Sequence, residues 1–328
     1  MSEKGTILVG TVGQGVFRSK DSGEVWGRMS VGQGMHSDCI TRCLTPHPAN
    51  PDVVFAGTDQ GLYRSDDAGG SWRRLATAMD GHTVWALTID DADPDVMLAG
   101  TGTPSPAGLY RSTDGGATWR QSEAELAETC PAVGVPRPTA LVLDPTDHRS
   151  VWAGIEVDGV RRSRDGGQTW QKAALDIPNP DVHNLLVTAG SPKRVFVLVN
   201  DDVWVSDDDG LSWNALGVRQ IFPWHYPRGV AGRRDDPDVV FVTVGDATPG
   251  RTGAVMRSCD AGRTWESLPL PGQPNSAMWT VTIPRSAPDL MFATSRYGYL
   301  YRSEDGGESW VRLWREFSEI SSLAWLPA

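Results

Sequence analysis

Short apolar runs separated by Gly- and Asp-rich turns recur along the whole chain. Residues 51–58 (Pro-Asp-Val-Val-Phe-Ala-Gly-Thr) and 61–64 (Gly-Leu-Tyr-Arg) are typical of one period, and residues 84–89 (Val-Trp-Ala-Leu-Thr-Ile) belong to the next. Apolar runs of about 4–8 residues between turn residues are typical of strands. Together with the segment that follows each turn, every period is predicted to hold four short strands.

One polar motif punctuates these runs, Ser-x-Asp-x-Gly-x-x-Trp, with successive Ser residues 43 to 52 positions apart. Ser and Asp side chains hydrogen-bond to nearby backbone, and Gly tolerates positive φ, so the motif predicts a turn between the third and fourth strands. The Trp would open the fourth strand and bury its ring against the neighbouring repeat. The seven copies span 19–26, 65–72, 112–119, 163–170, 206–213, 258–265 and 303–310.

Seven periods of four strands predict an all-β fold, a single seven-bladed β-propeller over residues 1–328. The two ends of the chain support this count. The chain opens with only three strands, at 6–12, 15–18 and 25–29, and it ends with one, at 320–326. We therefore expect the C-terminal strand to pair with the three N-terminal strands and to close the ring.

Composition narrows the classes of function. The net charge of −11 argues against a nucleic-acid partner, because proteins that bind nucleic acids need a basic surface. No apolar stretch approaches the roughly 20 residues of a membrane span. The first residues lack the charged and apolar regions of a signal peptide, and four Cys do not form a disulfide framework. We expect a cytoplasmic protein without a membrane partner. No cofactor motif is present.

The seven motif copies resemble the Asp-box, or BNR, repeat. This repeat is found in sialidases, xyloglucan-degrading hydrolases, sortilin-type receptors and a photosystem II assembly factor. The resemblance covers the whole chain and implies a propeller, but it implies no single activity because these proteins do unrelated things. The early Phe/Tyr-Arg-Ile-Pro segment of sialidases has no counterpart here.

The predicted meander also predicts where a ligand would bind. The 1–2 and 3–4 turns lie on one face of the disc, and the 2–3 loops and blade crossings lie on the other. All Asp-boxes are 3–4 turns, so they share the first face. The longer loops, at 101–108, 120–136, 214–224 and 245–253, fall on the second face. A site at the channel mouth on this loop-rich face is our expectation.

Alignment of the seven innermost strands gives two positions that face the channel. Polar and aromatic residues are frequent at both positions, although the repeats are alike elsewhere. The first position holds Ile40, Thr83, Arg137, Asp181, Tyr226, Ala277 and Glu319, and the second holds Arg42, Trp85, Thr139, His183, Arg228, Trp279 and Ser321.

These residues predict a pocket for a small molecule that is anionic or aromatic. Guanidinium groups hold carboxylates or phosphates bidentately, and two Trp rings would sandwich an apolar body. If the protein is an enzyme, His183 with Asp181 or Glu319 would supply acid–base chemistry for a hydrolase or lyase. The residues expected to contact the substrate are Arg42, Arg137, Arg228, Trp85, Trp279, Tyr226, His82 and His225.

Two alternatives stay open at this stage. The polar residues would also suit a channel that only holds water. A protein-interaction scaffold or assembly factor using the loop-rich face is the alternative function, with a protein as its partner. We assign no metal site, because His36, His82, His183 and His225 lack local ligand spacing, although these residues could be ligands from different blades with Asp181 or Glu319. The Asp of each box is expected to be structural, since a turn requires one per blade.

Overall fold

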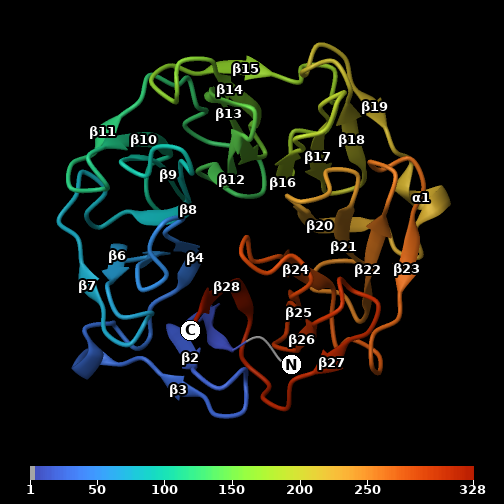
Figure 1. Cartoon of the computed structure of the whole chain (residues 1–328). Helices are drawn as coiled ribbons and strands as arrows, with labels where there is room; N and C mark the ends of the chain where they lie inside the picture. Colours follow the sequence, from blue (N-terminus) through green and yellow to red (C-terminus); the bar gives the residue numbers. More distant parts are fainter. Residues whose placement is uncertain (1–3) are drawn as a thin grey trace.

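Seven four-stranded antiparallel sheets surround a central axis, as Figure 1 shows. The computed structural model describes residues 4–328. The first strand of each blade lies next to the axis, and neighbouring innermost strands contact one another in succession around the ring. The fourth strand of each blade lies at the rim. The predicted seven-bladed β-propeller is confirmed.

The strands of successive rings differ in length, and those at the rim are the shortest. The innermost strands are β4 (Thr41–Pro46), β8 (Thr83–Ile89), β12 (Arg137–Asp144), β16 (Val182–Val187), β20 (Tyr226–Gly232), β24 (Met278–Thr282) and β28 (Ile320–Pro327). The second strands are β1 (Gly5–Thr11), β5 (Val54–Thr58), β9 (Val96–Gly102), β13 (Asp147–Glu156), β17 (Val195–Val199), β21 (Val240–Gly245) and β25 (Met291–Ser295).

The outer half of each blade carries the box turn. The third strands are β2 (Val16–Ser19), β6 (Gly61–Ser65), β10 (Gly108–Thr113), β14 (Gly159–Ser163), β18 (Val203–Ser206), β22 (Gly253–Ser258) and β26 (Leu300–Ser303). The fourth strands are β3 (Gly27–Arg28), β7 (Arg73–Arg74), β11 (Arg120–Gln121), β15 (Gln171–Ala173), β19 (Asn214–Ala215), β23 (Glu266–Leu268) and β27 (Val311–Arg312). Helical turns are limited, among the described residues, to η1 (Val31–Gln33) and α1 (Val218–Ile221).

The two ends of the chain share one blade. Strand β28 pairs with β1 from Gly5–Pro327 to Thr11–Ile320, which gives the sheet order β28-β1-β2-β3. Ile320 and Trp325 of β28 are buried in the core beside β1. The predicted closure of the ring by the C-terminal strand is confirmed.

All seven Asp-boxes form the same hydrogen-bonded turn. In the third blade, the Ser112 hydroxyl donates to Asp114 and accepts from the Gly116 N–H, and Asp114 also accepts from the Thr118 N–H. The Trp119 indole N–H donates to the Gly116 carbonyl. The Ser, Asp and Gly contacts recur in the other six boxes.

The box of the second blade also fixes the distance to the preceding blade. Gly69 has φ +79°, and a Cβ at this position would lie 2.6 Å from the Leu8 side chain of the preceding blade. The box turn accepts an Arg from that blade as well, since the Arg18 Nε donates to the Ala68 carbonyl at 2.8 Å. Gly is therefore required here both for its positive φ and for its lack of a side chain.

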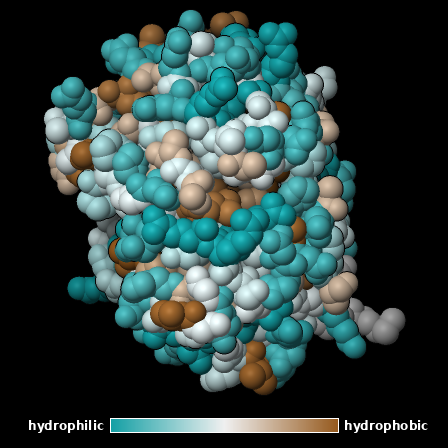
Figure 2. All heavy atoms as spheres, turned by 90° about the vertical axis from the view of Figure 1, so that its left-hand side faces the viewer, coloured by the Kyte–Doolittle hydropathy of each residue, from teal (hydrophilic) through white to brown (hydrophobic). Residues whose placement is uncertain are grey.

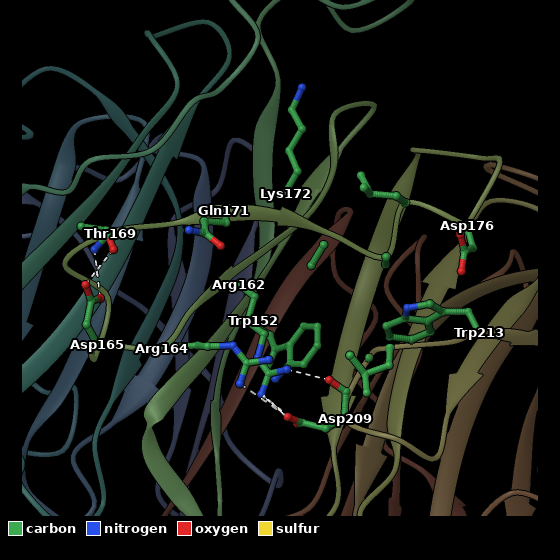
Figure 3. A pocket seen from close by; sticks show the side chains of 15 residues that line it. Trp152, Arg162, Arg164, Asp165, Thr169, Gln171, Lys172, Asp176, Asp209 and Trp213 are labelled. Carbon is green, nitrogen blue, oxygen red and sulfur yellow. Dashed lines mark hydrogen bonds and ion pairs between the residues drawn. The ribbon is translucent and has the colours of Figure 1, made fainter.

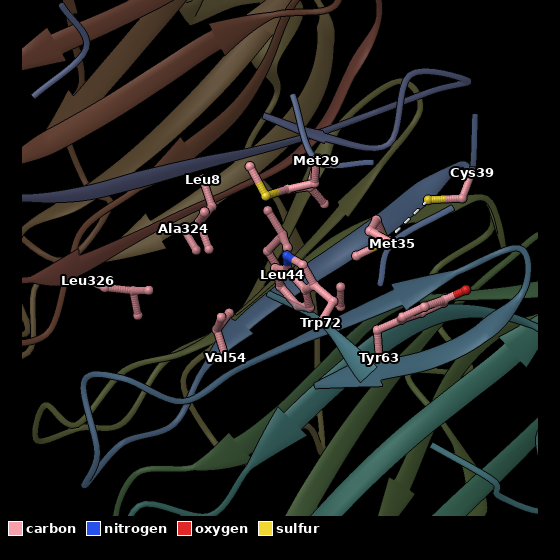
Figure 4. Close-up of a cluster of buried hydrophobic side chains, with 12 residues drawn as sticks. Leu8, Met29, Met35, Cys39, Leu44, Val54, Tyr63, Trp72, Ala324 and Leu326 are labelled. Atoms are coloured by element: carbon pink, nitrogen blue, oxygen red, sulfur yellow. Dashed lines mark hydrogen bonds between the residues drawn. The ribbon is translucent and has the colours of Figure 1, made fainter. Parts of the chain in front are cut away.

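The apolar core lies between blades, not within one. Figure 4 shows the cluster between the first two blades, where Leu8 and Leu326 of one blade meet Val54 and Trp72 of the next. Similar clusters fill the other interfaces. Burying large apolar side chains contributes about 1.5–3 kcal/mol each, so interfaces of this kind hold the ring together.

The side of the molecule seen in Figure 2 is mainly polar. Hydrophilic residues predominate there, and hydrophobic ones occur in small separate groups. Within residues 4–328, no helix has the length and apolar character needed to cross a membrane.

Candidate functional site

A β-bulge interrupts every innermost strand close to its start. In β4, for example, Thr41 pairs with Thr58 and Cys43 pairs with Gly57, which leaves Arg42 without a partner. A bulge turns the unpaired side chain away from the regular alternation of the strand. The seven bulged residues are Arg42, Trp85, Thr139, His183, Arg228, Trp279 and Ser321. They are the seven residues of the second predicted channel position.

These seven residues form the bulged ring, and all of them line one cavity of about 390 Å³. Val12 and Arg296, which directly follow second strands, also line it. These elements place the cavity at the channel mouth on the loop-rich face. The Asp-boxes lie on the opposite face, because box turns hydrogen-bond to 1–2 turns, as in the contact between Ala68 N and Asp52 O. The predicted location of the pocket is therefore the location of a real cavity.

Two Trp residues in this ring are each stacked by two guanidinium groups. The Arg42 and Arg137 guanidinium carbons lie 4.0 and 4.7 Å from the centre of the Trp85 ring. Around Trp279, the corresponding distances are 4.1 Å for Arg228 and 4.4 Å for Arg296. Guanidinium groups thus stack on the same two rings that the sequence analysis assigns to an apolar or ring-shaped ligand. Such contacts stabilise a cation by about 0.5–2 kcal/mol and hold its planar group in place.

The four arginines that line the cavity differ in their carboxylate partners. Arg137 pairs with the buried Glu156, and Arg296 pairs with Glu319 at 2.9 Å. Arg42 and Arg228 make no hydrogen bond or ion pair with any residue in 4–328. The Nε of Arg42 is buried without an acceptor. Two guanidinium groups thus face the cavity with their charge unmatched by a direct protein partner.

Burial and mutual repulsion lower the pKa values of these arginines. Burial lowers the pKa of Arg42 to about 10, although Glu319 opposes the change. Burial also lowers the pKa of Arg137 to about 10, and Arg228 and Arg42 add to this shift by repulsion. The pKa of Arg228 is lowered mainly by burial. All of these groups remain cationic at neutral pH, so the cavity keeps its positive charge.

His183 occupies the most enclosed part of the wall and is 4% exposed. Its Nδ1 donates to the Pro227 carbonyl at 2.8 Å, because a carbonyl can only accept. Burial, with repulsion from Arg228, keeps the pKa of His183 well below its usual range. His183 is therefore neutral at pH 7, and its Nε2 carries a lone pair. That Nε2 lies 3.4 Å from the Tyr226 hydroxyl and 3.8 Å from Asp181 Oδ2.

The structure brings together some of the predicted residues and separates others. Arg137 and Glu319, from the first predicted position, line the cavity with the bulged ring. The other five residues of that position do not, because the bulge ends the simple two-residue alternation on which the alignment relied. Asp181 and Tyr226 contact His183 from behind. His82 and His225 are absent from the lining.

Arg296 is the main residue that the sequence alignment missed. It directly follows β25, at the place where Asp59 follows β5 and Asp246 follows β21. A change from an acidic to a basic residue at one place in the repeat was the available signal. The alignment covered only innermost strands, so this signal lay outside it.

Two further cavities lie away from this ring. One, of about 450 Å³, lies between the fourth and fifth blades, where Trp152 and Trp213 flank the ion pair of Arg162 with Asp209 (Figure 3). The other, of about 390 Å³, lies at the box-side end of the channel and is lined largely by apolar residues such as Leu44. Neither is lined by a partly buried arginine without a hydrogen bond or ion pair among the described residues, so the bulged ring is the best candidate site.

Comparisons with known proteins agree with this fold. The BNR/Asp-box repeat model matches residues 161–172, and the Sortilin-Vps10 model (sortilin, neurotensin receptor 3) matches residues 14–140. Xyloglucanase Xgh74A of Acetivibrio thermocellus is 25% identical over 215 residues, which is 53% of this chain and 25% of that protein. A xyloglucanase of a Paenibacillus species is 26% identical over 337 residues, covering 84% of this chain and 32% of that protein.

The chain thus spans about a quarter to a third of the length of these curated relatives. Among solved structures, the GH74 xyloglucanase of Xanthomonas campestris has a TM-score of 0.63 and 24% identity, over 83% of this chain and 45% of that one. YCF48 bound to D1 peptide has a TM-score of 0.61 and 18% identity, over 96% of this chain and 90% of that one. These structures share its fold. With seven Asp-boxes in seven blades, the chain is a seven-bladed β-propeller built from BNR/Asp-box repeats.

Proposed function

We propose that this propeller binds a small organic anion, bearing a carboxylate or phosphate, in the cavity formed by the bulged ring. The observation that carries the proposal is that Arg42 and Arg228 face one cavity without a hydrogen bond or ion pair to any described residue. Partly buried charges are costly unless a counter-charge neutralises them. An anion that reached both groups would form charge-assisted hydrogen bonds, which are stronger than neutral ones.

The size and charge of the cavity restrict the ligand. Its volume of about 390 Å³ lies within the range of about 300–1,000 Å³ that is usual for small-molecule sites. Four arginines but only one carboxylate residue, Glu319, line it. Neutral sugar chains, such as those that the similar xyloglucanases are named for, would leave this charge unneutralised. We therefore favour an anion over a neutral glycan.

A peptide with a free C-terminal carboxylate would offer the same chemistry from another source. One structural neighbour, YCF48, is described as bound to a peptide, and it is a chain of similar extent. This alternative makes the protein a scaffold, not a metabolite-binding protein. It predicts that amidation of the peptide C-terminus abolishes binding.

A catalytic role has less support from the geometry. His183 contacts the cavity, but its low pKa makes it a weak base, and its Nε2 faces Tyr226 and Asp181. Glu319 is engaged with Arg296. A hydrolase or lyase activity would use His183 as the proton acceptor and would be lost in His183→Gln.

Calorimetric titration tests the proposal directly. We expect a panel of citrate, malonate, inorganic phosphate and sugar phosphates to include binders whose affinity falls at least tenfold in Arg42→Gln/Arg228→Gln. Short peptides with free or amidated C-termini and a xyloglucan oligosaccharide complete the panel. Arg120→Gln, which removes a charge at the exposed rim, is the control and should not change affinity. Equal affinities in the ring variant and the control would overturn the proposal.

A further inference from the structure

Behind the bulged ring, three potential metal ligands from two neighbouring blades converge. Glu156 ends β13, whereas Asp181 and His183 lie at the start of β16. One ligand atom from each lies within 4.8 Å of the others. The backbones of Glu156 and Asp181 form an isolated antiparallel bridge, which holds the two blades together at this point. No local sequence motif predicts this group, because Asp181 and His183 follow Glu156 by 25 and 27 residues.

The hydrogen bonds around this group leave one imidazole nitrogen and one carboxylate oxygen available to bind a cation. Because Nδ1 of His183 donates to the Pro227 carbonyl, Nε2 is the nitrogen that can bind a metal. This arrangement, in which the second nitrogen of a His ligand is held by a carbonyl, is usual in metal sites. The Oδ1 of Asp181 is buried and has no hydrogen-bond partner. A buried carboxylate oxygen without a hydrogen-bond donor is costly, and a cation bound to this carboxylate would offset that cost.

The remaining contacts hold the ligands in place. Asn200 donates to Asp181 Oδ2 at 3.0 Å, and Arg137 pairs with Glu156. The Tyr226 hydroxyl lies 3.4 Å from His183 Nε2, which is long for a hydrogen bond, so this contact engages the nitrogen only weakly. The 3.8 Å between His183 Nε2 and Asp181 Oδ2 is close to the separation of about 3.3–3.6 Å expected for two ligands with roughly 2.0–2.2 Å bonds to a tetrahedral zinc.

We propose that Glu156, Asp181 and His183 bind one divalent transition-metal ion. A nitrogen with two carboxylate oxygens suits Zn²⁺ or Mn²⁺, whereas Ca²⁺ and Mg²⁺ prefer all-oxygen sites. The nearby Arg137 and Arg228 oppose a cation, and the two carboxylates offset their charge. The site shares the His183 wall with the anion cavity but uses none of the unpaired arginines, so it stands or falls separately from the proposed function.

Zn²⁺ binding to the metal-stripped full-length chain tests the proposal. By equilibrium dialysis with metal analysis, we expect one Zn²⁺ per chain, no binding of Ca²⁺, and a rise in melting temperature on adding Zn²⁺. Asp181→Asn keeps the shape of the side chain and should weaken Zn²⁺ binding more than tenfold, because even residues that only orient a ligand typically contribute about 10–100-fold. His183→Ala should have a similar or larger effect.

The matched control is the other close pair of a His with a carboxylate, His148 with Asp90 at 2.6 Å, which has no third ligand among the described residues. His148→Ala should retain the full affinity for Zn²⁺. The proposal is overturned if the wild-type chain takes up no Zn²⁺, if Asp181→Asn and His183→Ala bind it as well as the wild type, or if His148→Ala loses as much. Circular dichroism confirms that each variant is folded. Titration of the anion panel with Zn²⁺-free protein separates this outcome from that of the arginine site.

Discussion

The Asp-box turns and the bulged ring repeat in every blade, but they repeat in opposite ways. In the boxes the residues themselves recur, so Ser112 and Ser206 make the same contacts. In the ring only the backbone recurs, and the bulge presents Arg42 in one blade, Trp85 in the next and Ser321 in another. Identical residues mark what every blade needs in order to fold. Different residues on an identical backbone mark a surface that each blade is free to use for another purpose.

This comparison predicts separate effects on stability and on binding. Changes at the boxes or at the ring closure should alter the free energy of unfolding and leave ligand affinity unchanged in folded protein. Changes at the bulged residues should do the reverse.

Deletion of residues 320–328 should abolish the native fold. The deletion removes all of β28, exposes one edge of β1 and uncovers the buried partners of Ile320, Leu323 and Trp325. Several large side chains at about 1.5–3 kcal/mol each amount to much of a total stability of about 5–15 kcal/mol. Near-UV circular dichroism and thermal melting measure the loss.

A peptide of residues 320–328 added to the truncated chain is the control, and it should restore part of the signal by pairing with β1. If the truncated chain melts cooperatively within a few degrees of the full chain, β28 does not close the ring energetically. The ring closure would then not be needed for stability, which would contradict the predicted separation between positions that determine the fold and positions that are free to vary.

Trp119→Ala should lower the free energy of unfolding by about 3–5 kcal/mol, as for other large buried truncations. Trp119 is 7% exposed, and its indole N–H bond to Gly116 would also be lost. Anion affinity should be unchanged at temperatures where the variant is folded. Trp314→Ala is the control, because Trp314 is 63% exposed and should change stability far less. Urea unfolding and calorimetry provide the two readouts, and a selective loss of binding in folded Trp119→Ala would contradict the separation.

Arg228→Gln should weaken anion binding about 10–100-fold, since a hydrogen bond to a charged group contributes about 1.5–3 kcal/mol. Stability should change little or rise, because the substitution removes a partly buried cation without an ion-pair partner among the described residues. Titration calorimetry on the best anion of the panel measures the first effect, and thermal melting the second. A clear fall in stability with unchanged affinity would show that Arg228 is needed for folding. The bulged residues would then have the same structural role as the box residues.

The sequence was sufficient for the fold because the boxes and apolar runs express local requirements. Ser, Asp and Gly in a fixed spacing have one geometric use, and the incomplete first and last blades predict the closure. The channel was harder to predict. The alignment found the seven bulged residues, yet it could not show that a bulge, instead of plain alternation, aims them inward.

The rest of the site depends on contacts that no local pattern encodes. The stacking of Arg42 on Trp85 joins two blades, and the stacking of Arg137 on the same ring joins a third. Arg296 comes from a loop, and the direction of His183 is fixed by the Pro227 carbonyl of the next blade. Such contacts arise only when the ring has formed, so the sequence predicted the types of residue but not their partners.

The smallest effect concerns acid and the boxes. Hydrogen bonds from Thr118 and Ser112 lower the pKa of Asp114 to about 2, from an ordinary 3.8. Because the folded value lies below the unfolded one, the carboxylate stabilises the fold above about pH 4, and this contribution is lost as the pH falls toward 2. Asp114→Asn should therefore be less stable than the wild type at pH 7. The difference between their free energies of unfolding should narrow at about pH 3. Urea unfolding at the two pH values measures it.

Asp176→Asn is the control, because Asp176 is exposed and makes no hydrogen bond to any residue in 4–328. The difference in the free energy of unfolding between this variant and the wild type should not narrow when the pH falls. Partial burial opposes the shift at Asp165, but hydrogen bonds from the same box positions lower the pKa values of both Asp165 and Asp208 to about 2. The same narrowing is therefore expected for Asn at either position. A gap that stays constant with pH in all three variants would mean that the box carboxylates act through shape and not through charge. Narrowing in only one blade would mean that the boxes, like the ring, have been adapted individually.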